Sequence, residues 1–586
     1  MCGINGFNFL DKNKIQKMMT LTENRGPDAK GIFESESMTL GHNRLSIIDL
    51  STAANQPLTD DNLTIIFNGE IYNYKSLREK LLLKGVNFKT NSDTEVIIKL
   101  FKEYGDDSFK MLSGIFAIAI WDSKKNELVL IRDIVGVKPL YYYHNTNEKK
   151  FYFSSLIKSI LVSKKDNEVN NKALNYYLNF WHNDLSETTF KDIYKVQPGE
   201  LIKFKENKLY KKKLLKFDFS RKILNPKNEI KRIFEKQLVS DVPVAISLSG
   251  GVDSNLIFSI MKESIKKKFK TYSVKFDDGK NIDANVAKHN SQMHNFENIQ
   301  VNVSHNDFID SIEKIVEIME EPVGNQNSIA NYILSQKIEE KVLFTGDGGD
   351  EIFTGYDKYK SIFLLSKLSK MNFINIFNFS SSKNFSRLRF KKPEEFYLSF
   401  SEQNLMQNQS KYFNKFEKIK YQDLSFNHQV NPNESILNNV MFLDIQTWIQ
   451  NDSLARNDKI FMNNGVEVRV PFLDQEMIEN FLYISDYKKI GFFENNKPYI
   501  KNLFKNELNE LTKKKQGFDS PFSFWLQNKL FDFAKNILTK DYYNGEKYLN
   551  YNYIQNFVKD FKNDGKNPYL LWSLIVLQVY LKKFNL

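Results

Sequence analysis

Residues 244–254 read Val-Ala-Ile-Ser-Leu-Ser-Gly-Gly-Val-Asp-Ser, an apolar run that passes through two glycines into the helical pattern of residues 255–262. This order predicts a strand, a tight turn and the first turn of a helix. Apolar strands at 271–276 and 341–344 also alternate with helical segments. The second half of the chain is therefore predicted to be a parallel α/β sheet.

The turn at Ser249–Ser254 has the character of a phosphate site. Free backbone N–H groups and the helix dipole at a helix N-terminus attract anions. The spacing differs from that of a Walker loop. A glycine-rich turn without a ligand is the alternative interpretation.

Acidic residues follow the strand at 341–344. The segment Thr345-Gly346-Asp347-Gly348-Gly349-Asp350-Glu351 places three carboxylates among glycines. Such carboxylates can hold Mg²⁺, which prefers oxygen ligands and bridges to phosphate. An acidic turn without a function is the alternative.

The first 200 residues have a different pattern. Short apolar runs at 63–67, 114–121, 128–132 and 151–155 are separated by turn residues, which predicts strands of packed sheets. A charged stretch at about 205–231 is the best boundary, which gives domains at 2–205 and 206–586. Helical periodicity dominates beyond about residue 360, and residues 361–433 are interpreted as a variable insertion or a loosely ordered helical region.

Composition narrows the class of protein. The 586 residues carry a formal net charge of +12 and a single cysteine, which excludes a disulfide framework and suits a reducing compartment. The start of the chain lacks a signal-peptide pattern, and the apolar run 570–581 is too short and interrupted for a membrane span. The lysines are scattered without a nucleic-acid-binding motif. We expect a cytoplasmic protein with no nucleic acid or membrane partner.

That single cysteine is Cys2, which becomes the N-terminal residue if the initiator Met is removed. An α-amino group titrates near pH 7.7 to 8.0, so a fraction of it is neutral and can take the thiol proton. The nucleophile and the general base would then belong to one residue.

Polar residues elsewhere in the first half can complete an acyl-transfer site. Asn68 and Gly69 can donate to an oxyanion, and Arg44 can pair with a carboxylate. Glu70 or Asp93 can receive an ammonium group. Some of these motifs could instead have a purely structural role, since Ser92 and Glu95 match a capping box for the helix 96–104. Together these groups indicate a site for an α-amino acid with a cleavable side-chain amide.

The motifs resemble the N-terminal-nucleophile domain of class II glutamine amidotransferases. They are Cys2-Gly3-Ile4, Arg25-Gly26-Pro27-Asp28, Arg44-Leu45-Ser46-Ile47, Phe67-Asn68-Gly69-Glu70 and Ser92-Asp93-Thr94-Glu95. The resemblance implies a four-layer αββα sandwich, attack of Cys2 on glutamine and an oxyanion hole of Asn68 and Gly69. The glutamine-binding residues that it implies are Arg44, Leu45, Ser46, Ile47, Ile48, Asn68, Gly69, Glu70 and Asp93.

The second half resembles the synthetase domain of glutamine-hydrolysing asparagine synthetases. Further motifs that carry this resemblance are Asp458-Lys459, residues 465–474 and Lys513-Lys514-Lys515-Gln516-Gly517-Phe518. The implied chemistry is adenylation of the aspartate side chain by ATP, followed by attack of ammonia that reaches the intermediate through an internal passage. The implied ATP-binding residues are Leu248, Ser249, Gly250, Gly251, Val252, Asp253, Ser254, Val274, Thr345 and Gly346.

The same resemblance assigns the remaining roles. Asp253 and Asp350 are expected to bind Mg²⁺, Lys515 to stabilise charge on the phosphates, and Asp347 to handle the intermediate and the ammonia. Glutamine, aspartate and ATP are the expected substrates, and relatives often form homodimers.

Several positions depart from the commonest pattern of the family. Asn255 stands where Ser is usual, Lys459 where Arg is usual and Leu156 where Glu is usual. These departures leave open a same-fold enzyme that amidates another carboxylate, such as a uronic acid of a surface polysaccharide. A cyclase and a non-catalytic scaffold are less favoured, because Cys2 and the loop Ser249–Ser254 are both intact.

Overall fold

The structure is a computed structural model of the whole chain. It describes residues 2–164, 167–184, 186–221, 223–322, 324–369, 387, 389–401, 411–414, 430–491, 496–508 and 521–586. The predicted Lys515 and its motif lie outside the described residues, as does most of the segment 361–433.

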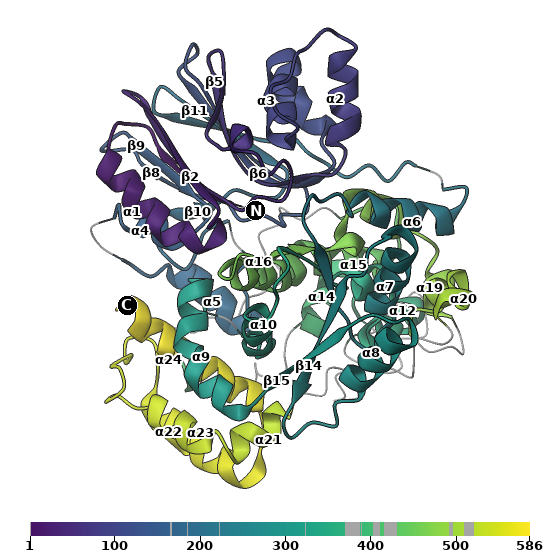
Figure 1. The fold of residues 1–586 in the computed structure, drawn as a ribbon. Helices are drawn as coiled ribbons and strands as arrows, with labels where there is room; N and C mark the ends of the chain where they lie inside the picture. Colours follow the sequence, from purple (N-terminus) through teal and green to yellow (C-terminus); the bar gives the residue numbers. More distant parts are fainter. Residues whose placement is uncertain are drawn as a thin grey trace.

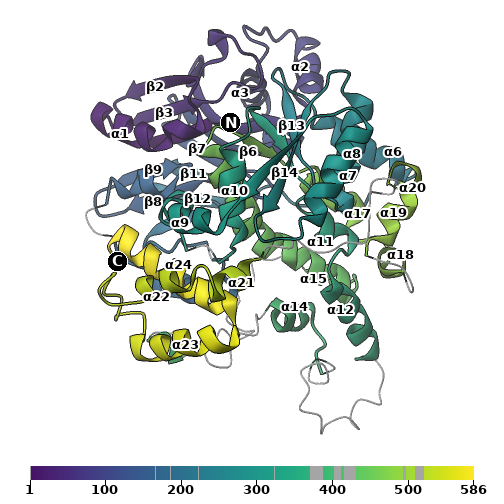
Figure 2. The same cartoon turned by 60° about the horizontal axis from the view of Figure 1, so that its bottom comes forward.

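The first half contains two six-stranded antiparallel sheets that pack against each other (Figures 1 and 2). One has the strand order β10-β8-β9-β1-β3-β2 and the other β12-β11-β7-β6-β5-β4. Ile4 and Leu40 from the first sheet form one apolar cluster with Ile66 and Ala117 from the second. The strand bounds are β1 Cys2–Phe7, β2 Ala29–Ser35, β3 Met38–Arg44, β4 Leu58–Asp60, β5 Leu63–Ile71, β6 Gly114–Asp122, β7 Glu127–Arg132, β8 Tyr141–Asn145, β9 Lys150–Ser154, β10 Ile193–Lys195, β11 Glu200–Lys205 and β12 Lys208–Lys213.

Helices cover the outer faces of these sheets. On the first sheet lie α1 (Lys12–Thr22) and α4 (Ile157–Leu161), and beside the second lie α2 (Tyr74–Leu82) and α3 (Asp93–Tyr104). The αββα sandwich expected from the resemblance is therefore confirmed.

The start of α3 differs in one detail from the predicted capping box. Ser92 Oγ accepts the N–H of Glu95 at 3.2 Å, as an N-cap residue does. The Glu95 carboxylate instead accepts the N–H groups of Lys89 and Thr90. The reciprocal half of the box is absent from this described segment because the loop before the helix folds back onto Glu95.

The second half is built on a parallel sheet of five strands, in the order β15-β14-β13-β16-β17. This confirms the predicted α/β class. Helices α7 (Val252–Ser264) and α8 (Ile282–Met293) cover one face, and α10 (Asn327–Ser335) and α16 (Ala455–Met462) cover the other (Figure 1). The strand bounds are β13 Val244–Ser247, β14 Lys270–Phe276, β15 Asn298–Val303, β16 Val342–Phe344 and β17 Glu467–Arg469.

The strand β17 is an element that the helical pattern beyond residue 360 did not predict. Its three residues pair in parallel with β16. A strand this short has too few residues to show an alternating pattern.

The other described part of the second half is helical. The long apolar run 570–581 forms the buried centre of α24. Helix bounds outside those given above are α5 Asn171–Phe180, α6 Pro226–Lys236, α9 His305–Met319, α11 Gly349–Phe353, α12 Asp357–Leu368, α14 Pro393–Ser401, α15 Ile436–Asp444, α17 Gln475–Phe481, α18 Asp486–Ile490, α19 Pro498–Leu503, α20 Lys505–Leu508, α21 Phe522–Gln527, α22 Phe531–Ile537, α23 Tyr551–Asp564 and α24 Pro568–Phe584.

The division of the chain at residue 205 stays a prediction. Strand β12 lies beyond it and pairs with β11 along its whole length, from Glu200 opposite Lys213 to Lys205 opposite Lys208. We therefore propose that the first domain extends to the end of this hairpin.

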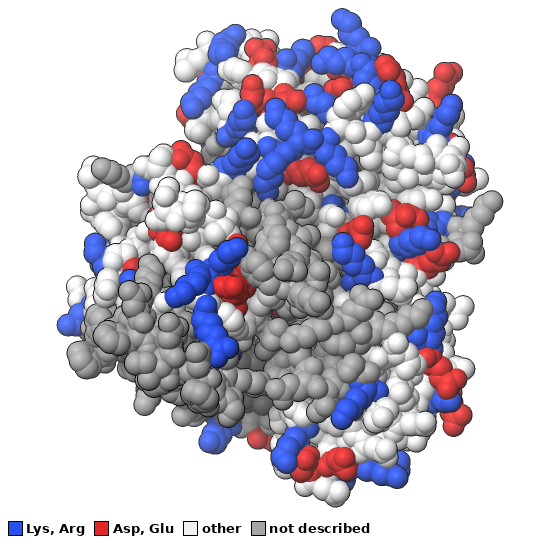
Figure 3. All heavy atoms as spheres, turned by 180° about the vertical axis from the view of Figure 1, so that it is seen from behind, with Lys and Arg blue, Asp and Glu red and all other residues white. Residues whose placement is uncertain are grey.

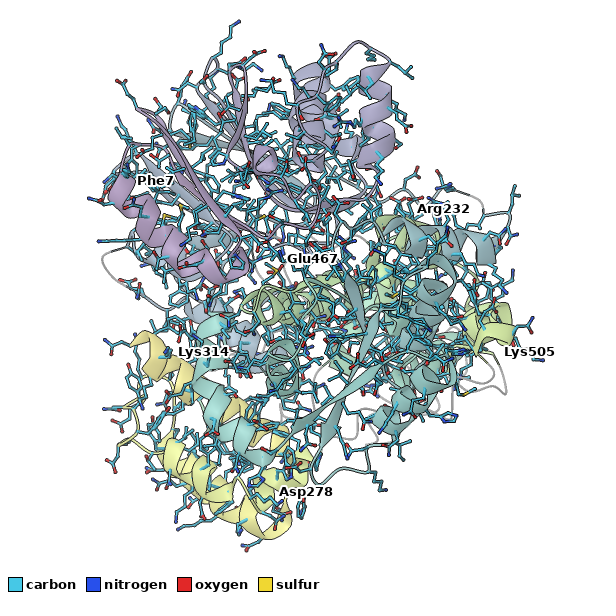
Figure 4. All side chains as sticks on the ribbon, in the orientation of Figure 1. Phe7, Arg232, Asp278, Lys314, Glu467 and Lys505 are labelled. Carbon is cyan, nitrogen blue, oxygen red and sulfur yellow. The ribbon has the colours of Figure 1, made fainter. Side chains whose placement is uncertain are left out.

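Buried charges gather where the two halves meet. Arg25 of the first half pairs with Asp458 of α16 at 2.7 Å. Glu320, which follows α9, pairs with Lys459 at 2.8 Å, and its two carboxylate oxygens also accept the N–H groups of Ile157 and Lys158 at the start of α4. Figure 4 shows Glu467 at the same junction, below the two sheets. Charged groups removed from water require such partners.

The outer surface carries basic and acidic side chains side by side. Figure 3 shows Lys and Arg interspersed with Asp and Glu on one face, with basic side chains more numerous over the upper part. Among the helices that the structure describes, none combines the length and apolarity needed to cross a lipid bilayer.

Replacing Glu320 with Ala tests how much the buried charges at this junction stabilise the protein. We expect the free energy of unfolding to fall by about 3 kcal/mol, because Lys459 would remain buried without its carboxylate. Urea unfolding followed by tryptophan fluorescence measures this. Glu168→Ala is the matched control, since its pair with Lys191 is exposed, and its unfolding curve should match that of the parent protein. Equal curves for both variants would contradict the prediction.

Candidate active sites

Cys2 is the first residue of β1 and lies opposite Arg44 of β3. Its backbone N–H donates to Asn68 Oδ1 at 2.9 Å, and its carbonyl accepts from Arg25 Nε at 3.2 Å. Burial raises the pKa of the Cys2 thiol, and the positive charge of the nearby amino terminus opposes that rise. The backbone of Cys2 is thus fixed by Asn68 and Arg25, and its thiol requires a base to become a nucleophile.

Asn68 has a feature expected of an oxyanion donor, and its neighbour Gly69 sits where no side chain fits. Asn68 Nδ2 is buried and has no hydrogen-bond partner within the described part of the chain. Gly69 has a φ of 153°, and a Cβ at this position would lie 2.0 Å from the carbonyl oxygen of Ile115. Only glycine fits there. The role of these two residues in an oxyanion hole stays a prediction.

A small cavity opens beside Cys2. Ser46 and Asn68 are not among its lining residues, and the backbone N–H of Ser46 donates to Asp28 Oδ2 at 2.7 Å. The predicted glutamine-binding residues that do line the cavity are Arg44, Leu45, Ile47, Ile48, Gly69, Glu70 and Asp93.

Arg44 is engaged by the loop that follows it. Its guanidinium donates to the Asn55 side chain at 2.7 Å and to the carbonyls of Ser51, Ile48 and Asp49. Arg44 therefore holds the loop that lines the cavity in place.

Two carboxylates supply negative charge to this cavity. Burial raises the pKa of Asp93 to about 6, and the N–H of Ile71, at 3.1 Å, partly offsets that rise. The pKa of Glu70 is also raised by burial, with contributions from the nearby Glu467 and Asp93. Arg469 Nη2 lies 3.6 Å from Glu70 Oε2. Asp93 is thus charged at neutral pH and can receive an ammonium group.

The second site lies at the carboxyl ends of β13, β14 and β16. Ligands of open α/β sheets bind at such edges. The loop Ser249–Ser254 joins β13 to α7, and the Ser254 hydroxyl accepts the N–H of Ser249 at 3.0 Å. Leu248 is bonded to Tyr272 of β14, and Val274 lies two residues before the end of that strand. The predicted ATP-binding residues therefore meet in one region.

Asn255, a departure from the family pattern, supports this loop. Its Nδ2 donates to the carbonyls of Ser249 at 2.9 Å and Gly251 at 2.7 Å. Its Oδ1 accepts from Asn290 at 2.8 Å. The longer amide can reach two carbonyls at once, which a serine hydroxyl with its single proton cannot do.

Asp347 is held by three donors. Thr345 Oγ1 and Asn457 Nδ2 donate to Asp347 Oδ2 at 2.7 and 2.9 Å, and Ser453 Oγ donates to Asp347 Oδ1. Ser453 and Asn457 come from the helical segment at 445–462, so a distant part of the chain fixes this carboxylate.

Lys497 lies between Asp253 and Asp350, whose expected role as Mg²⁺ ligands stays a prediction. Lys497 Nζ bonds to Asp253 Oδ2 and lies 2.6 Å from Asp350 Oδ1. Gly349 allows the approach of Asp253, since a Cβ there would lie 2.4 Å from its Oδ1. Sequence reasoning did not identify Lys497, which is separated from both partners by more than 140 residues.

Two short connections link the sites. On α16, Asp458 pairs with Arg25 beside Cys2, while its neighbour Asn457 binds Asp347. On β17, the carbonyl of Arg469 accepts the N–H of Thr345 at 3.0 Å, while its guanidinium faces Glu70. Sequence reasoning missed Arg469, although it lies in a motif that carries the resemblance.

Family models match both halves of the chain. A glutamine amidotransferase domain model matches residues 1–215, and an asparagine synthase model matches residues 227–582.

Individual relatives agree with these matches. The chain is 30% identical to asparagine synthetase [glutamine-hydrolyzing] 1 of Bacillus subtilis, over 97% of this chain and 93% of the relative. It is 28% identical to asparagine synthetase [glutamine-hydrolyzing] 3 of the same organism, over 82% and 80%. It is also 26% identical to the amidase chyE of Penicillium rubens, over 93% and 90%.

The raised pKa of Asp93 predicts how the rate of glutamine hydrolysis falls at the acidic end of its pH profile. Below about pH 6 the carboxyl takes up a proton and loses its attraction for an ammonium group, so kcat/KM for glutamine should fall. Asp93→Asn should lower kcat/KM roughly 10- to 100-fold and remove this fall at acidic pH, because a hydrogen bond to a charged group is lost. Glutamate release between pH 5 and 8 measures both, with Asp107→Asn as an exposed control. A flat profile down to pH 5 would contradict this assignment.

Replacement of Asn255 with Leu tests the support of the loop Ser249–Ser254. Leu keeps the branched skeleton of Asn but removes the amide group that donates to two backbone carbonyls, so the KM for ATP should rise on the order of tenfold. Pyrophosphate release at varied ATP measures the change. Glutamine hydrolysis is the internal control and should be unaffected, since Cys2 lies in the other domain. An unchanged KM for ATP would show that the loop holds its shape without Asn255.

Proposed function

Because the chain belongs to the family of glutamine-hydrolysing asparagine synthetases, we propose that it makes asparagine from aspartate, glutamine and ATP. The observation that carries this proposal is that helix α16 contacts residues of both candidate sites. Asp458 of this helix pairs with Arg25 beside Cys2, and the adjacent Asn457 holds Asp347 in the second site.

The first half-reaction would take place at Cys2. The thiolate attacks the side-chain amide carbon of glutamine, and the oxygen that becomes negative is stabilised by donors such as Asn68 Nδ2. Collapse of this intermediate releases ammonia and leaves a thioester, which water hydrolyses to glutamate. Asp93 would hold the substrate ammonium group during these steps.

The second half-reaction would take place at the edge of the parallel sheet. The loop Ser249–Ser254 offers N–H groups to the phosphates of ATP, and a side-chain oxygen of aspartate attacks the α-phosphorus with loss of pyrophosphate. Asp253 and Asp350 fit a Mg²⁺ site, because both carboxylates already converge on one cation. Mg²⁺ would neutralise charge on the phosphates.

Ammonia would then displace AMP from the activated carboxyl. Release into water would protonate most of the ammonia and remove it as a nucleophile, so an internal passage is expected. Its course stays a prediction, as do the phosphate contact of Lys515, the cytoplasmic location and a homodimer. The residues around α16 are the ones that such a passage would adjoin.

A product assay tests the proposal. Purified protein is incubated with ATP, Mg²⁺, glutamine and aspartate, and AMP, pyrophosphate and asparagine are followed together while each component is omitted in turn. Cys2→Ala should abolish asparagine formation from glutamine and retain at least half of the rate with ammonium chloride. Glutamine hydrolysis without aspartate-dependent release of pyrophosphate would refute aspartate as the acceptor.

One observation favours a second candidate, the amidation of a larger carboxylate. A cavity of about 550 Å³ lies next to the surroundings of Asp347, since Asp452 lines the cavity and the next residue, Ser453, donates to Asp347. This volume is within the range of roughly 300–1,000 Å³ seen for sites of drug-sized ligands. Aspartate alone is much smaller than such a ligand.

The walls of this cavity suit a ring-bearing molecule. Trp181, Tyr356, Trp448 and Tyr569 line it together with the polar Asn325. Flat aromatic faces beside amide groups can contact the apolar face of a sugar ring and bond its hydroxyls. The similarity to an amidase of Penicillium rubens also supports an acceptor other than aspartate.

Measuring pyrophosphate release with different carboxylates shows which of them is the acceptor. Aspartate, glucuronate and galacturonate are tested with the parent protein and with Trp448→Ala. An acceptor that uses the cavity should lose at least about tenfold in kcat/KM with this variant, whereas the rate with aspartate should remain within about twofold.

A further inference from the structure

Lys497 occupies the place that the proposed function gives to a metal ion. Its ammonium group bonds to Asp253 on the phosphate loop and to Asp350 at the start of α11. The lysine is 2% exposed, so its charge depends on these two carboxylates. Charged groups in such surroundings are retained only with close partners.

The local backbone directs the Lys497 side chain into this position. Asn496 Nδ2 donates to the carbonyl of Gly355 at 2.8 Å, and Lys497 itself has a φ of 63°. A Cβ at Gly355 would lie 2.5 Å from Lys497 Cε and 1.6 Å from Asp350 Oδ1. Gly355 therefore leaves the space through which the lysine reaches the two carboxylates.

A metal ion and this ammonium group would compete for the same oxygens. Two cations at one pair of carboxylates repel each other strongly at such short range. If Mg²⁺ binds to Asp253 and Asp350, as the proposed function requires, Lys497 has to give up at least one of them. It then needs another anion, and the phosphates of ATP on the loop that carries Asp253 are the nearest ones expected.

We propose that Lys497 is a phosphate-binding residue that holds the two metal-binding carboxylates together before ATP arrives. When Mg²⁺ and ATP bind, the metal takes Asp253 and Asp350, and the ammonium group turns to the phosphates. In the nucleotide-free protein the lysine keeps the metal out, so metal and nucleotide enter together. No bond is made or broken in this step, and Lys497 keeps its proton.

The binding of Mn²⁺ to the protein without nucleotide tests the first half of the proposal. Electron paramagnetic resonance of free Mn²⁺ is used to titrate the parent protein and Lys497→Met. The variant should bind one additional Mn²⁺ at least about tenfold more tightly, because a competing positive charge has been removed. Adding Asp350→Asn to this variant should abolish the gain.

Controls separate this effect from unfolding. Lys505→Met removes an exposed lysine of α20, the next helix along the chain (Figure 4), and should bind Mn²⁺ like the parent protein. Glutamine hydrolysis at Cys2 should be retained in Lys505→Met, and a circular dichroism spectrum like that of the parent protein shows that each other variant is folded. If Lys497→Met does not fold, Lys497→Gln provides a neutral side chain that can still donate a hydrogen bond. Unchanged Mn²⁺ affinity in a folded neutral variant would overturn the proposal.

The affinity for ATP tests the proposed contact of Lys497 with the phosphates. At saturating Mg²⁺, Lys497→Met should bind ATP at least about tenfold more weakly, because one charge-assisted contact to phosphate is lost. Lys497→Arg keeps the charge and should recover part of that affinity. Equal affinity in all three proteins would overturn the phosphate role. Failure of the proposed function is seen separately, as absence of acceptor-dependent pyrophosphate release from the parent protein.

Discussion

Burial of charge between the two halves is the constraint on which the rest of the structure depends. Arg25, Glu320, Asp458 and Arg469 lie almost entirely out of water. Arg25 pairs with Asp458 and Arg469 faces Glu70 across the junction, whereas Glu320 pairs with Lys459 of its own half and accepts the N–H groups of Ile157 and Lys158 from the other. Separation of the halves would leave these buried charges without partners. Because these partners belong to the strands and helices that also carry the two sites, the sites keep a fixed spacing.

The carboxylate of Asp347, beside the parallel sheet, shows how a side chain of the candidate site is oriented by distant residues. Asp347 follows β16, yet two of its three hydrogen bonds come from Ser453 and Asn457, about 100 residues later in the chain. An acidic turn between glycines would otherwise sample many conformations, since glycine restricts the backbone little. The helical segment supplies the rigidity that the loop itself lacks.

Sequence motifs predicted the parts of the sites that are local in the chain. The loop Ser249–Ser254 and the acidic turn at 345–351 could be located because each follows an apolar strand. Cys2 could be singled out because it lies next to the amino terminus. Arg469 and Lys497 could not be assigned roles, because their partners are fixed by tertiary packing. The capping box at Ser92 was half wrong for the same reason, since the loop before the helix takes the Glu95 carboxylate.

The connection through Arg469 has a consequence for the evolution of the chain. Its carbonyl belongs to the hydrogen-bond ladder beside the nucleotide loop, while its guanidinium completes the charge balance of a carboxylate in the other domain. A glutaminase domain taken from a different relative would bring a foreign partner to that guanidinium. Recombination at the domain boundary would then join two intact folds with mismatched charges at their junction. The two domains are therefore expected to be inherited as a unit, which agrees with the two large apolar clusters that contain residues of both.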